Sequence, residues 1–306
     1  VGSSFEHPAT RSAAKYWAAQ TKRQYINVQH DDTLGHVTAE HYSNIVTPDT
    51  RVVTILHASP VTGISVDLKK ISEAVRSISP DALIIVDGVQ YAAHGGIKID
   101  DYDIDGYAIS PYKMYSRHGY GFAWVSDRLT QMQHEQLLDG PGENWELGTR
   151  DTGSYATLSD VVEYLEWLGE KVESTNNRTK KLTNAAKAIA AQETSLTELM
   201  INGEDNIKGL KDLEGIEIIG GEKNPNRKGL VSFRIVGSQS QEIVDFLNVN
   251  GIRTHVRKAD HYSGNILNPL GWEDCVRVSV CHYNSSEEIK SLLLALNEFQ
   301  LKLPTN

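Results

Sequence analysis

The sequence has few cysteines, no long apolar run and no excess of positive charge. Its two cysteines, Cys275 and Cys281, are too few for a disulfide framework and lie in no zinc-type cluster. A reducing compartment, the cytoplasm, is therefore expected. No apolar run approaches the roughly 18–20 residues of a membrane span, so no membrane contact is predicted. The net charge of −10 argues against nucleic acid or an anionic membrane as the main partner.

The chain also lacks an initiator methionine and the layout of a signal peptide. It opens on Val1-Gly2-Ser3, which resembles a strand end in the middle of a fold, so we expect an upstream segment to be missing from this sequence. A length of 306 residues allows one large domain and a smaller one. Hydrophobic and charged contents of 40% and 23% are typical of a globular protein.

The first half of the chain alternates short apolar runs with helical patterns. Strands are predicted at residues 51–57, 82–87, 105–110 and 121–125. Residues 67–78 place apolar side chains at helical spacing behind a possible N-cap, Asp67. This alternation predicts an α/β domain with a parallel or mixed sheet, whose ligands bind at the carboxyl ends of the strands. Asp87 and Ser110 fall at such ends.

The second half begins with two long helical stretches, residues 154–169 and 175–200. Strands at 215–219, 230–236 and 275–280 follow, joined by helices at 239–248 and 286–301. The pattern predicts a compact α+β domain. We therefore divide the chain into a large domain of residues 1–170 and a small C-terminal domain of residues 171–306, which includes the linking helix.

The spacing of Asp87 and Lys113 is the most informative feature of the sequence. Asp87 ends a buried strand, and Lys113 follows the next apolar segment 26 residues later. Pyridoxal 5'-phosphate chemistry needs this pair, because the lysine forms a Schiff base and the acid keeps the pyridine nitrogen protonated. Taken singly, each residue is also consistent with a turn cap or a solvated charge. A cofactor-free Schiff-base aldolase would need the lysine but not the acid.

Five short segments strengthen the interpretation. They are Glu6-His-Pro-Ala-Thr10, Val86-Asp-Gly-Val-Gln90, Ser110-Pro-Tyr-Lys113, Trp145-Glu-Leu-Gly-Thr149 and Arg277-Val-Ser-Val-Cys-His-Tyr-Asn284. With these motifs the chain resembles the class V aminotransferase and cysteine desulfurase family of fold type I pyridoxal-phosphate enzymes over nearly its whole length. The resemblance implies a large domain with a mainly parallel sheet of the seven-stranded type, a small α+β domain and a homodimer with a shared active site.

The resemblance also implies roles for residues around the cofactor ring. His7 would stack on the ring and move protons, although a histidine before a helix-starting proline is also a common surface feature. Asp87 would pair with the pyridine nitrogen, and Gln90 would reach the phenolic oxygen or, alternatively, cap the next helix. Lys113 would be the catalytic Schiff-base lysine, which requires burial to lower its pKa.

Other residues would hold the phosphate and the substrate. Ser110 and Tyr112 would contact the phosphate of their own subunit, with inward packing as the alternative for Tyr112. Thr149 would reach the phosphate of the neighbouring subunit across a dimer interface. Arg277 would bind the α-carboxylate of an amino-acid substrate bidentately, unless it simply pairs with an acid on its sheet.

The sequence departs from the family pattern at several places. Tyr262, a candidate substrate-binding residue, stands where desulfurases carry their sulfur-accepting cysteine, in the loop 257–264, so a persulfide mechanism is not expected. Pro60 replaces a usual asparagine. Arg117 replaces part of a usual Gly-Pro and is a candidate for a second anionic group of the substrate, or else a surface arginine. The glycine/threonine loop that normally holds the phosphate is not in this sequence.

These features predict an enzyme that acts on an amino acid through its Schiff base with the cofactor. Lyase-type chemistry, either C–S cleavage by β-elimination or decarboxylative chemistry at Cβ, is favoured over persulfide formation. A class V aminotransferase, an amino-acid epimerase and a truncated, non-catalytic cofactor-binding relative are the alternatives. No metal site is predicted, because His30, His36 and His41 fit no compact ligand pattern.

Overall fold

A computed structural model describes residues 1–31, 35–142 and 144–302. Its main sheet contains four strands in the order β3-β4-β5-β6, of which the first three are parallel and the last is antiparallel to its neighbour. Their bounds are β3 Val52–Leu56, β4 Leu83–Asp87, β5 Gly106–Ile109 and β6 Phe122–Val125. The buried apolar side chains of β3 and β4 explain why these runs form central strands.

The chain start extends this sheet on the β3 side. Strand β1 (Gly2–Ser3) pairs in parallel with β2 (Asn27–Val28). The amino group of Val1 donates to the Val52 carbonyl at 2.8 Å, and the Thr54 N–H donates to the Val1 carbonyl at 2.9 Å. The parallel character predicted for the sheet is thus confirmed, although it has fewer than seven strands in the described part of the chain.

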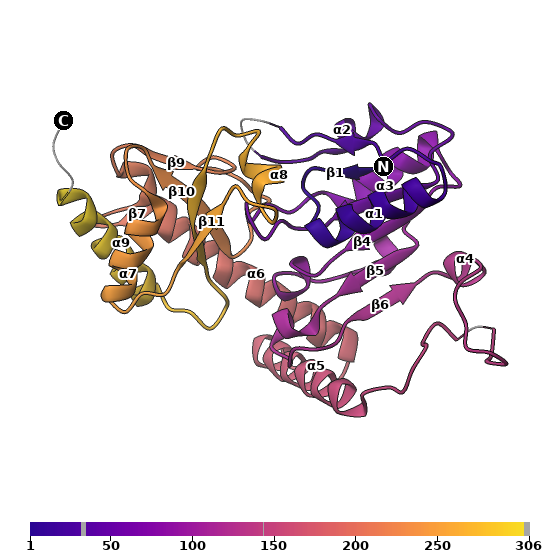
Figure 1. The fold of residues 1–306 in the computed structure, drawn as a ribbon. Helices are drawn as coiled ribbons and strands as arrows, with labels where there is room; N and C mark the ends of the chain where they lie inside the picture. Colours follow the sequence, from indigo (N-terminus) through magenta and orange to yellow (C-terminus); the bar gives the residue numbers. More distant parts are fainter. Residues whose placement is uncertain (32–34, 143, 303–306) are drawn as a thin grey trace.

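Helices flank the sheet, and α1 and α3 are seen on it in Figure 1. They are α1 Pro8–Gln20, α2 Ala39–Ser43 and α3 Leu68–Ile78. Helix α3 begins as the sequence predicts, because the Asp67 carboxylate accepts a hydrogen bond from the Lys70 N–H at 3.1 Å. By contrast, α1 has no buried residue.

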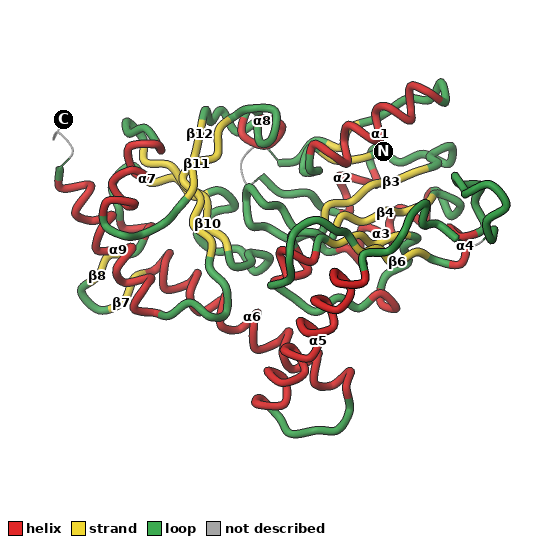
Figure 2. Tube along the Cα trace, turned by 60° about the horizontal axis from the view of Figure 1, so that its bottom comes forward, coloured by secondary structure: helices red, strands yellow, loops and turns green. Residues whose placement is uncertain are grey.

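Two long helices lead from the main sheet to the second sheet. They are α5 Thr152–Val172 and α6 Arg178–Asn202, preceded by the short α4 Asp127–Thr130. Figure 2 shows α5 and α6 as a hairpin that projects from the body of the molecule. The helices cross closely at Gly169, where an added Cβ atom would lie 1.8 Å from the Lys181 carbonyl oxygen, so no larger residue fits.

The second sheet is antiparallel and has the order β11-β12-β10-β9. Its strands and helices are β9 Ile216–Ile218, β10 Leu230–Ile235, α7 Ser240–Val249, β11 His255–Lys258, α8 Gly264–Leu267, β12 Asp274–Ser279 and α9 Ser286–Leu301. The remaining short elements are η1 Tyr91–Ala93, η2 Ile99–Asp101, η3 Pro111–Met114, β7 Gly203–Glu204, β8 Ile207–Lys208 and η4 Leu210–Asp212. The predicted strands and helices of this half are all present within a few residues.

Two apolar cores accompany the two sheets. One consists mainly of residues from the first 107 positions, and the other of residues from 196 to 299. Ile219, Ile266 and Cys275 nevertheless contribute to the first core. These cores support the division at residue 170, which remains a prediction.

Strand β11 was not predicted from the sequence. Residues 257–264 were interpreted as a loop, but residues 255–258 form an edge strand beside β12. The strand carries His255, Arg257 and Lys258, so it lacks the apolar run by which strands were recognised. This edge strand contributes to the candidate site described next.

Candidate active site

The acid and the lysine singled out in the sequence meet at one edge of the main sheet. Asp87 ends β4 and is paired in register with Ala108 of β5. Strand β5 then leads into η3, which carries Lys113. Parallel strands place their carboxyl ends at the same edge, so both side chains reach it. There the Lys113 amine donates a hydrogen bond to Oε1 of Gln90 at 2.8 Å.

The surroundings of Lys113 favour its neutral amine. Burial lowers the pKa of Lys113 from 10.5 to about 8, and the charges of Arg277 and Arg257 act in the same direction. The Asp87 carboxylate opposes them. With a pKa of about 8, roughly a tenth of the amine is neutral at pH 7, compared with well under a thousandth for an ordinary lysine. The lowered pKa suits a nucleophilic lysine.

Gln90 is held by a buried pair that the sequence did not reveal. Its Nε2 lies 2.9 Å from Nε2 of His94, whose Nδ1 lies 2.9 Å from the Glu193 carboxylate. An amide nitrogen only donates, so His94 accepts at Nε2 and carries its proton on Nδ1. His94 and Glu193 are 5% and 1% exposed. The hydrogen-bonded series Lys113–Gln90–His94–Glu193 therefore connects η3 to helix α6.

Asp87 is positioned by two donors. The Thr10 hydroxyl donates to Oδ2 at 3.3 Å, and the Val89 N–H donates to Oδ1 at 3.1 Å. Thr10 lies on α1, which begins after His7. The N-terminal helix and the strand edge are thus joined at the predicted acid.

His7 has the local role of a helix cap and also lies at the site. Its Nδ1 accepts a hydrogen bond from the Ala9 N–H at 3.2 Å, and Pro8 starts the helix. Partial burial lowers its pKa, while the Asp87 charge raises it and Lys113 and Arg257 lower it further. Its ring centroid lies 6.3 Å from that of Tyr262. The structure therefore brings the predicted His7 and Tyr262 together.

A second acid lies behind Asp87. Glu6 is 1% exposed, and burial together with the charge of Asp87 raises its pKa to about 8. Its Oε1 accepts a hydrogen bond from the Leu56 N–H at 3.1 Å, while its Oε2 has no hydrogen-bond partner among the described residues. A neutral carboxyl is the favoured form in this position.

Two arginines approach from the second sheet. Nη1 of Arg277 donates to the Pro60 carbonyl at 3.0 Å. The arginine therefore contacts the backbone of Pro60, one of the positions where the sequence departs from the family pattern. Burial, reinforced by Arg257, lowers the pKa of Arg277 to about 10. The Nε atoms of both arginines are buried and have no hydrogen-bond partner in the described part of the chain.

The register of β11 and β12 places these side chains on one face. Arg277 is directly opposite His255, and residues paired in this way project to the same side of a sheet. Arg257 lies two residues after His255 on β11 and projects to that side as well. Lys258 projects to the other side.

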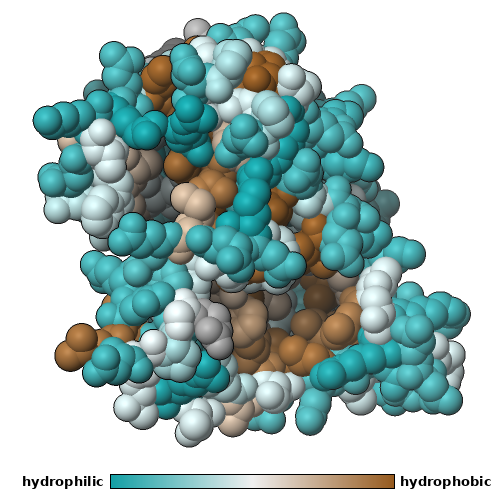
Figure 3. All heavy atoms as spheres, turned by 90° about the vertical axis from the view of Figure 1, so that its right-hand side faces the viewer, coloured by the Kyte–Doolittle hydropathy of each residue, from teal (hydrophilic) through white to brown (hydrophobic). Residues whose placement is uncertain are grey.

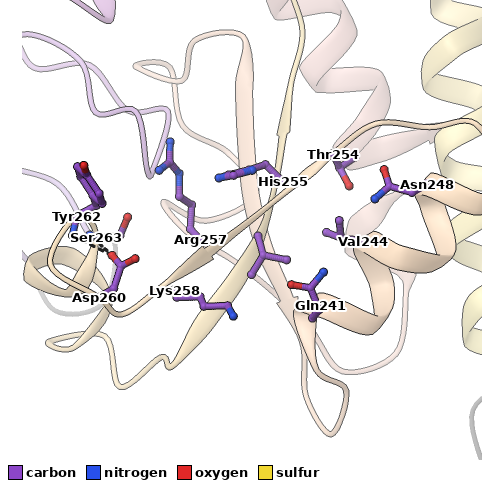
Figure 4. Close-up of a pocket in the computed structure, with 11 residues that line it drawn as sticks. Gln241, Val244, Asn248, Thr254, His255, Arg257, Lys258, Asp260, Tyr262 and Ser263 are labelled. Carbon is purple, nitrogen blue, oxygen red and sulfur yellow. Dashed lines mark hydrogen bonds between the residues drawn. The ribbon is translucent and has the colours of Figure 1, made fainter.

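A pocket of about 550 Å³ adjoins this strand. It is lined by Gln241, Val244, Asn248, Thr254, His255, Val256, Arg257, Lys258, Asp260, Tyr262 and Ser263. Figure 4 shows Arg257 on the side of Tyr262 and Lys258 on the side of Gln241. Lys113 and Asp87 do not line this pocket, which is therefore a neighbour of the cofactor site rather than the site itself.

The structure places the remaining predicted residues away from this cluster or at its border. Ser110 precedes η3, and its carbonyl accepts from the Lys113 N–H at 3.0 Å. Tyr112 is 39% exposed and stacks on His118 at a centroid distance of 4.2 Å. Thr149 is exposed in the segment between α4 and α5. No contact between these residues and Lys113 other than this backbone bond is found in the described region.

Arg117 has partners that differ from the predicted substrate contact. Its guanidinium pairs with the Asp151 carboxylate and with the Ser154 hydroxyl at the start of α5. Asp151 is also the N-cap of that helix. The structure thus favours the surface-arginine alternative for Arg117.

Neither cysteine resembles a sulfur-accepting nucleophile. Burial raises the pKa of the Cys275 thiol to about 12 and also raises that of Cys281. Tyr262, at the position of the desulfurase cysteine, is 52% exposed next to His261. A thiolate is therefore favoured at neither Cys275 nor Cys281.

Three residues of this region were missed by sequence reasoning. His94 follows Gln90 by four residues, a spacing that is typical of a contact across one helical turn. Glu193 had no signal, since it lies 99 residues from its partner His94. Arg257 was noted only as the start of a loop, because β11 was not recognised.

Comparisons with known proteins agree with the geometry. The family Aminotransferase class-V matches residues 1–292. A probable cysteine desulfurase of Xylella fastidiosa (strain Temecula1 / ATCC 700964) is 26% identical over 92% of this chain and 65% of its own length. This chain thus spans about two thirds of the length of that relative.

Solved structures show the same fold. The cysteine desulfurase CsdA from Escherichia coli has a TM-score of 0.78 at 22% identity, covering 99% of this chain and 72% of its own. A C-DES mutant with glycine covalently linked to the PLP cofactor has a TM-score of 0.73 at 20% identity, covering 96% and 73%. The predicted fold type I architecture is confirmed, and so is pyridoxal phosphate as the cofactor of the family. The chain belongs to the aminotransferase class-V family of pyridoxal-phosphate-dependent enzymes.

Proposed function

We propose that this protein uses pyridoxal phosphate to act on an amino acid by lyase-type chemistry at Cβ. The observation that carries the proposal is the position of Lys113, whose amine has a lowered pKa and lies at the same sheet edge as Asp87. A buried amine beside a strand-end acid suits this cofactor and has little use in a purely structural role.

The residues present fit the ring of the cofactor. Asp87 offers a carboxylate to the pyridine nitrogen, Lys113 offers an amine to the aldehyde carbon, and Gln90 offers an amide to the phenolic oxygen. When bound, the cofactor supplies an electron sink for the bond broken in the substrate. In this proposal Asp87 keeps the ring nitrogen protonated, and Lys113 moves a proton at the substrate Cα.

The other predicted residues complete the proposed site. His7 stacks on the ring, Ser110 and Tyr112 contact the phosphate, and Arg277 binds the α-carboxylate. The buried and unpartnered Nε of Arg277 supports its role, because a bidentate carboxylate would satisfy it. Tyr112 would have to leave His118 to reach a phosphate.

Lyase-type chemistry is favoured over sulfur transfer by the chemistry of the nucleophile. Tyr262 has no thiol to accept sulfur, and the two cysteines are held as neutral thiols. The proposal covers C–S cleavage by β-elimination and decarboxylative chemistry at Cβ. Transamination and epimerisation are the alternatives within the same family, and a non-catalytic cofactor-binding relative is the alternative outside enzymes.

We further propose that the protein acts as a homodimer in the reducing environment of the cytoplasm, where its two free cysteines stay reduced. Figure 3 shows apolar patches gathered on one face of the molecule. Exposed large apolar residues occur on α1, on β6 and in the segment after α4; they include Trp17, Phe122, Trp124, Leu138 and Trp145. Such surface is typical of a protein interface, and Thr149 in the same segment would then reach the phosphate in the second subunit.

Reduction with borohydride tests whether Lys113 carries the cofactor. The purified protein, incubated with pyridoxal phosphate, should show an absorbance band that disappears on reduction, with the modification mapped to Lys113. Lys98→Ala, which removes an exposed lysine, should behave like the parent protein. A colourless protein that takes up no cofactor would contradict the proposal and would support a truncated, non-catalytic chain.

Asp87→Ala separates this proposal from a cofactor-free lysine aldolase. The substitution should remove the cofactor band and the activity in the first case and have little effect in the second. Activity is measured with a panel of amino acids as release of sulfide, carbon dioxide or keto acid. Keto acid formed with transfer of the amino group to the cofactor would indicate an aminotransferase instead.

A further inference from the structure

We propose that Arg257 binds a second anionic group of the substrate, so that the substrate is an amino acid with an acidic side chain. The inference deepens the proposed function and rests on it, because Arg277 is taken as the ligand of the α-carboxylate. Two arginines on one face of the second sheet would then bind the two carboxylates of one molecule.

The geometry places both guanidinium groups at the same site. Arg277 on β12 is opposite His255, and Arg257 follows two residues later on the same face of β11. The charges of both arginines act on Lys113, and the charge of Arg257 acts on Arg277. The charge of Arg257 also acts on His7. Arg257 therefore lies on the same face of the sheet as Arg277, close enough to Lys113 for its charge to act on the amine.

Arg257 lacks the protein partners that other half-buried arginines have. Arg76 pairs with Asp105 at 2.8 Å, and Arg234 pairs with Glu217 at 2.7 Å. Arg227, which is 7% exposed, donates to the carbonyls of Ile219 and Gly221. The Arg257 side chain forms no hydrogen bond or ion pair with any described residue, and its Nε is buried. A partly buried cation without a partner is costly, and an anionic ligand would offset that cost.

The charges at the site favour a ligand with more than one carboxylate. Arg257 and Arg277 face the site as cations, whereas Asp87 acts on Lys113 and is assigned to the pyridine nitrogen. Asp260 acts on Arg257 from a distance, but its Oδ1 accepts the N–H groups of Tyr262 and Ser263. One guanidinium fork matches one carboxylate. A single α-carboxylate on Arg277 therefore leaves Arg257 unmatched.

This assignment replaces the one that the sequence suggested. Arg117 was the candidate for a second anionic group, but its guanidinium is bound by Asp151 and Ser154. Arg257 has the burial and the vacant donors that Arg117 lacks. Tyr262 lies beside this position and also approaches His7.

Binding of matched acids and amides to the holoenzyme tests the inference. Aspartate and asparagine, and likewise glutamate and glutamine, have nearly the same shape but differ in side-chain charge. Dissociation constants are measured from the change in cofactor absorbance. We expect the acid of at least one pair to bind about 10- to 100-fold more tightly than its amide, the range for a hydrogen-bonded charge.

Variants of Arg257 and a control variant test whether this residue causes the preference for acids over amides. Arg257→Gln should reduce the affinity for the acid to about that for the amide and leave the affinity for the amide within about twofold. Arg253→Gln, which removes an exposed arginine just before β11, is the matched control and should keep the preference. Arg257→Lys keeps the positive charge but not the bidentate guanidinium group, so it should retain part of the preference for acids.

A readout without the cofactor gives an independent check. Succinate should raise the melting temperature of the apoprotein more than butyrate does, and Arg257→Gln should abolish the difference. Equal binding of acids and amides by the parent holoenzyme would overturn the inference, as would an equal loss of both in Arg257→Gln. If the lysine takes up the cofactor but no acid is preferred, only this inference fails; if no adduct forms, the proposed function itself fails.

Discussion

The lysine side and the arginine side of the candidate site differ in how completely their polar groups are satisfied. On the lysine side, Lys113 donates to Gln90, which is held by His94 and Glu193. On the arginine side, the Arg257 side chain has no hydrogen-bond partner among the described residues, and the Arg277 side chain has among them only the Pro60 carbonyl. Both sides are half-buried or buried, so the difference is not one of solvent access.

This difference indicates separate tasks. Satisfied donors and acceptors fix a side chain in one position, which suits a group that must hold a cofactor with defined geometry. Unsatisfied cationic donors are available to a ligand that enters and leaves. The lysine side is therefore preorganised by the protein itself, whereas the arginine side is completed by what binds to it.

The largest expected effect comes from breaking the satisfied side. Glu193→Ala leaves the Nδ1–H of the buried His94 without an acceptor and should lower the free energy of unfolding by about 2–4 kcal/mol. Chemical denaturation measures the change. Glu198→Ala, an exposed acid on the same helix, is the control and should have little effect. Equal behaviour of the two variants would show that the buried pair does not stabilise the lysine side.

The second effect concerns the pKa of Lys113, which the two arginines on the other side of the site help to lower. Because the pKa of Lys113 is lowered to about 8, its neutral fraction rises steeply between pH 6 and pH 8. The rate of cofactor uptake by the apoprotein should increase about 50-fold over this interval and level off above it, since only the neutral amine attacks. Stopped-flow absorbance follows the reaction. A rate that keeps rising up to pH 10 would show that burial and the arginines do not lower the pKa.

The third effect concerns Glu6, which is an exception on the lysine side because its Oε2 has no hydrogen-bond partner among the described residues. Its pKa is raised from 4.5 to about 8, so the folded state binds the proton more tightly than the unfolded chain does. The raised pKa of Glu6 therefore lowers the free energy of unfolding as pH rises from about 4.5 to 8. Glu6→Gln should therefore stabilise the protein by about 1–3 kcal/mol at pH 8 and by little at pH 5.

Thermal and chemical unfolding at the two pH values measure this effect. Glu40→Gln, which changes an exposed acid, is the control and should show no such dependence on pH. A stabilisation of the Glu6 variant that is the same at both pH values would contradict the assigned pKa.

The smallest effect is expected for the arginine that already has partners. Arg117→Ala removes an ion pair with Asp151 in which both side chains are about half exposed, so the free energy of unfolding should fall by less than about 1 kcal/mol. Amino-acid binding to the holoenzyme should stay within about twofold of the parent. A large loss of affinity for acidic amino acids would instead indicate that Arg117, and not Arg257, binds the second anionic group of the substrate.

The elements that the sequence predicted are those with a strong local signal. Helix α3 has apolar residues at helical spacing and a capping Asp67, and α9 begins and ends at the predicted residues. Strand β4 is an apolar run that ends at Asp87. Strand β11 was missed because His255, Arg257 and Lys258 are polar or charged, which leaves no apolar pattern in its four residues.

The sequence by itself determined the family, the strand-end acid and the lysine, because these depend on short motifs and on the carboxyl ends of parallel strands. Only the tertiary structure decided which polar groups are paired. Glu193 reaches His94 across 99 residues, Asp151 takes up Arg117, and Arg257 lies beside Arg277 through the pairing of β11 with β12. Such pairings depend on how distant segments pack, and the spacing of residues along a chain carries no record of that.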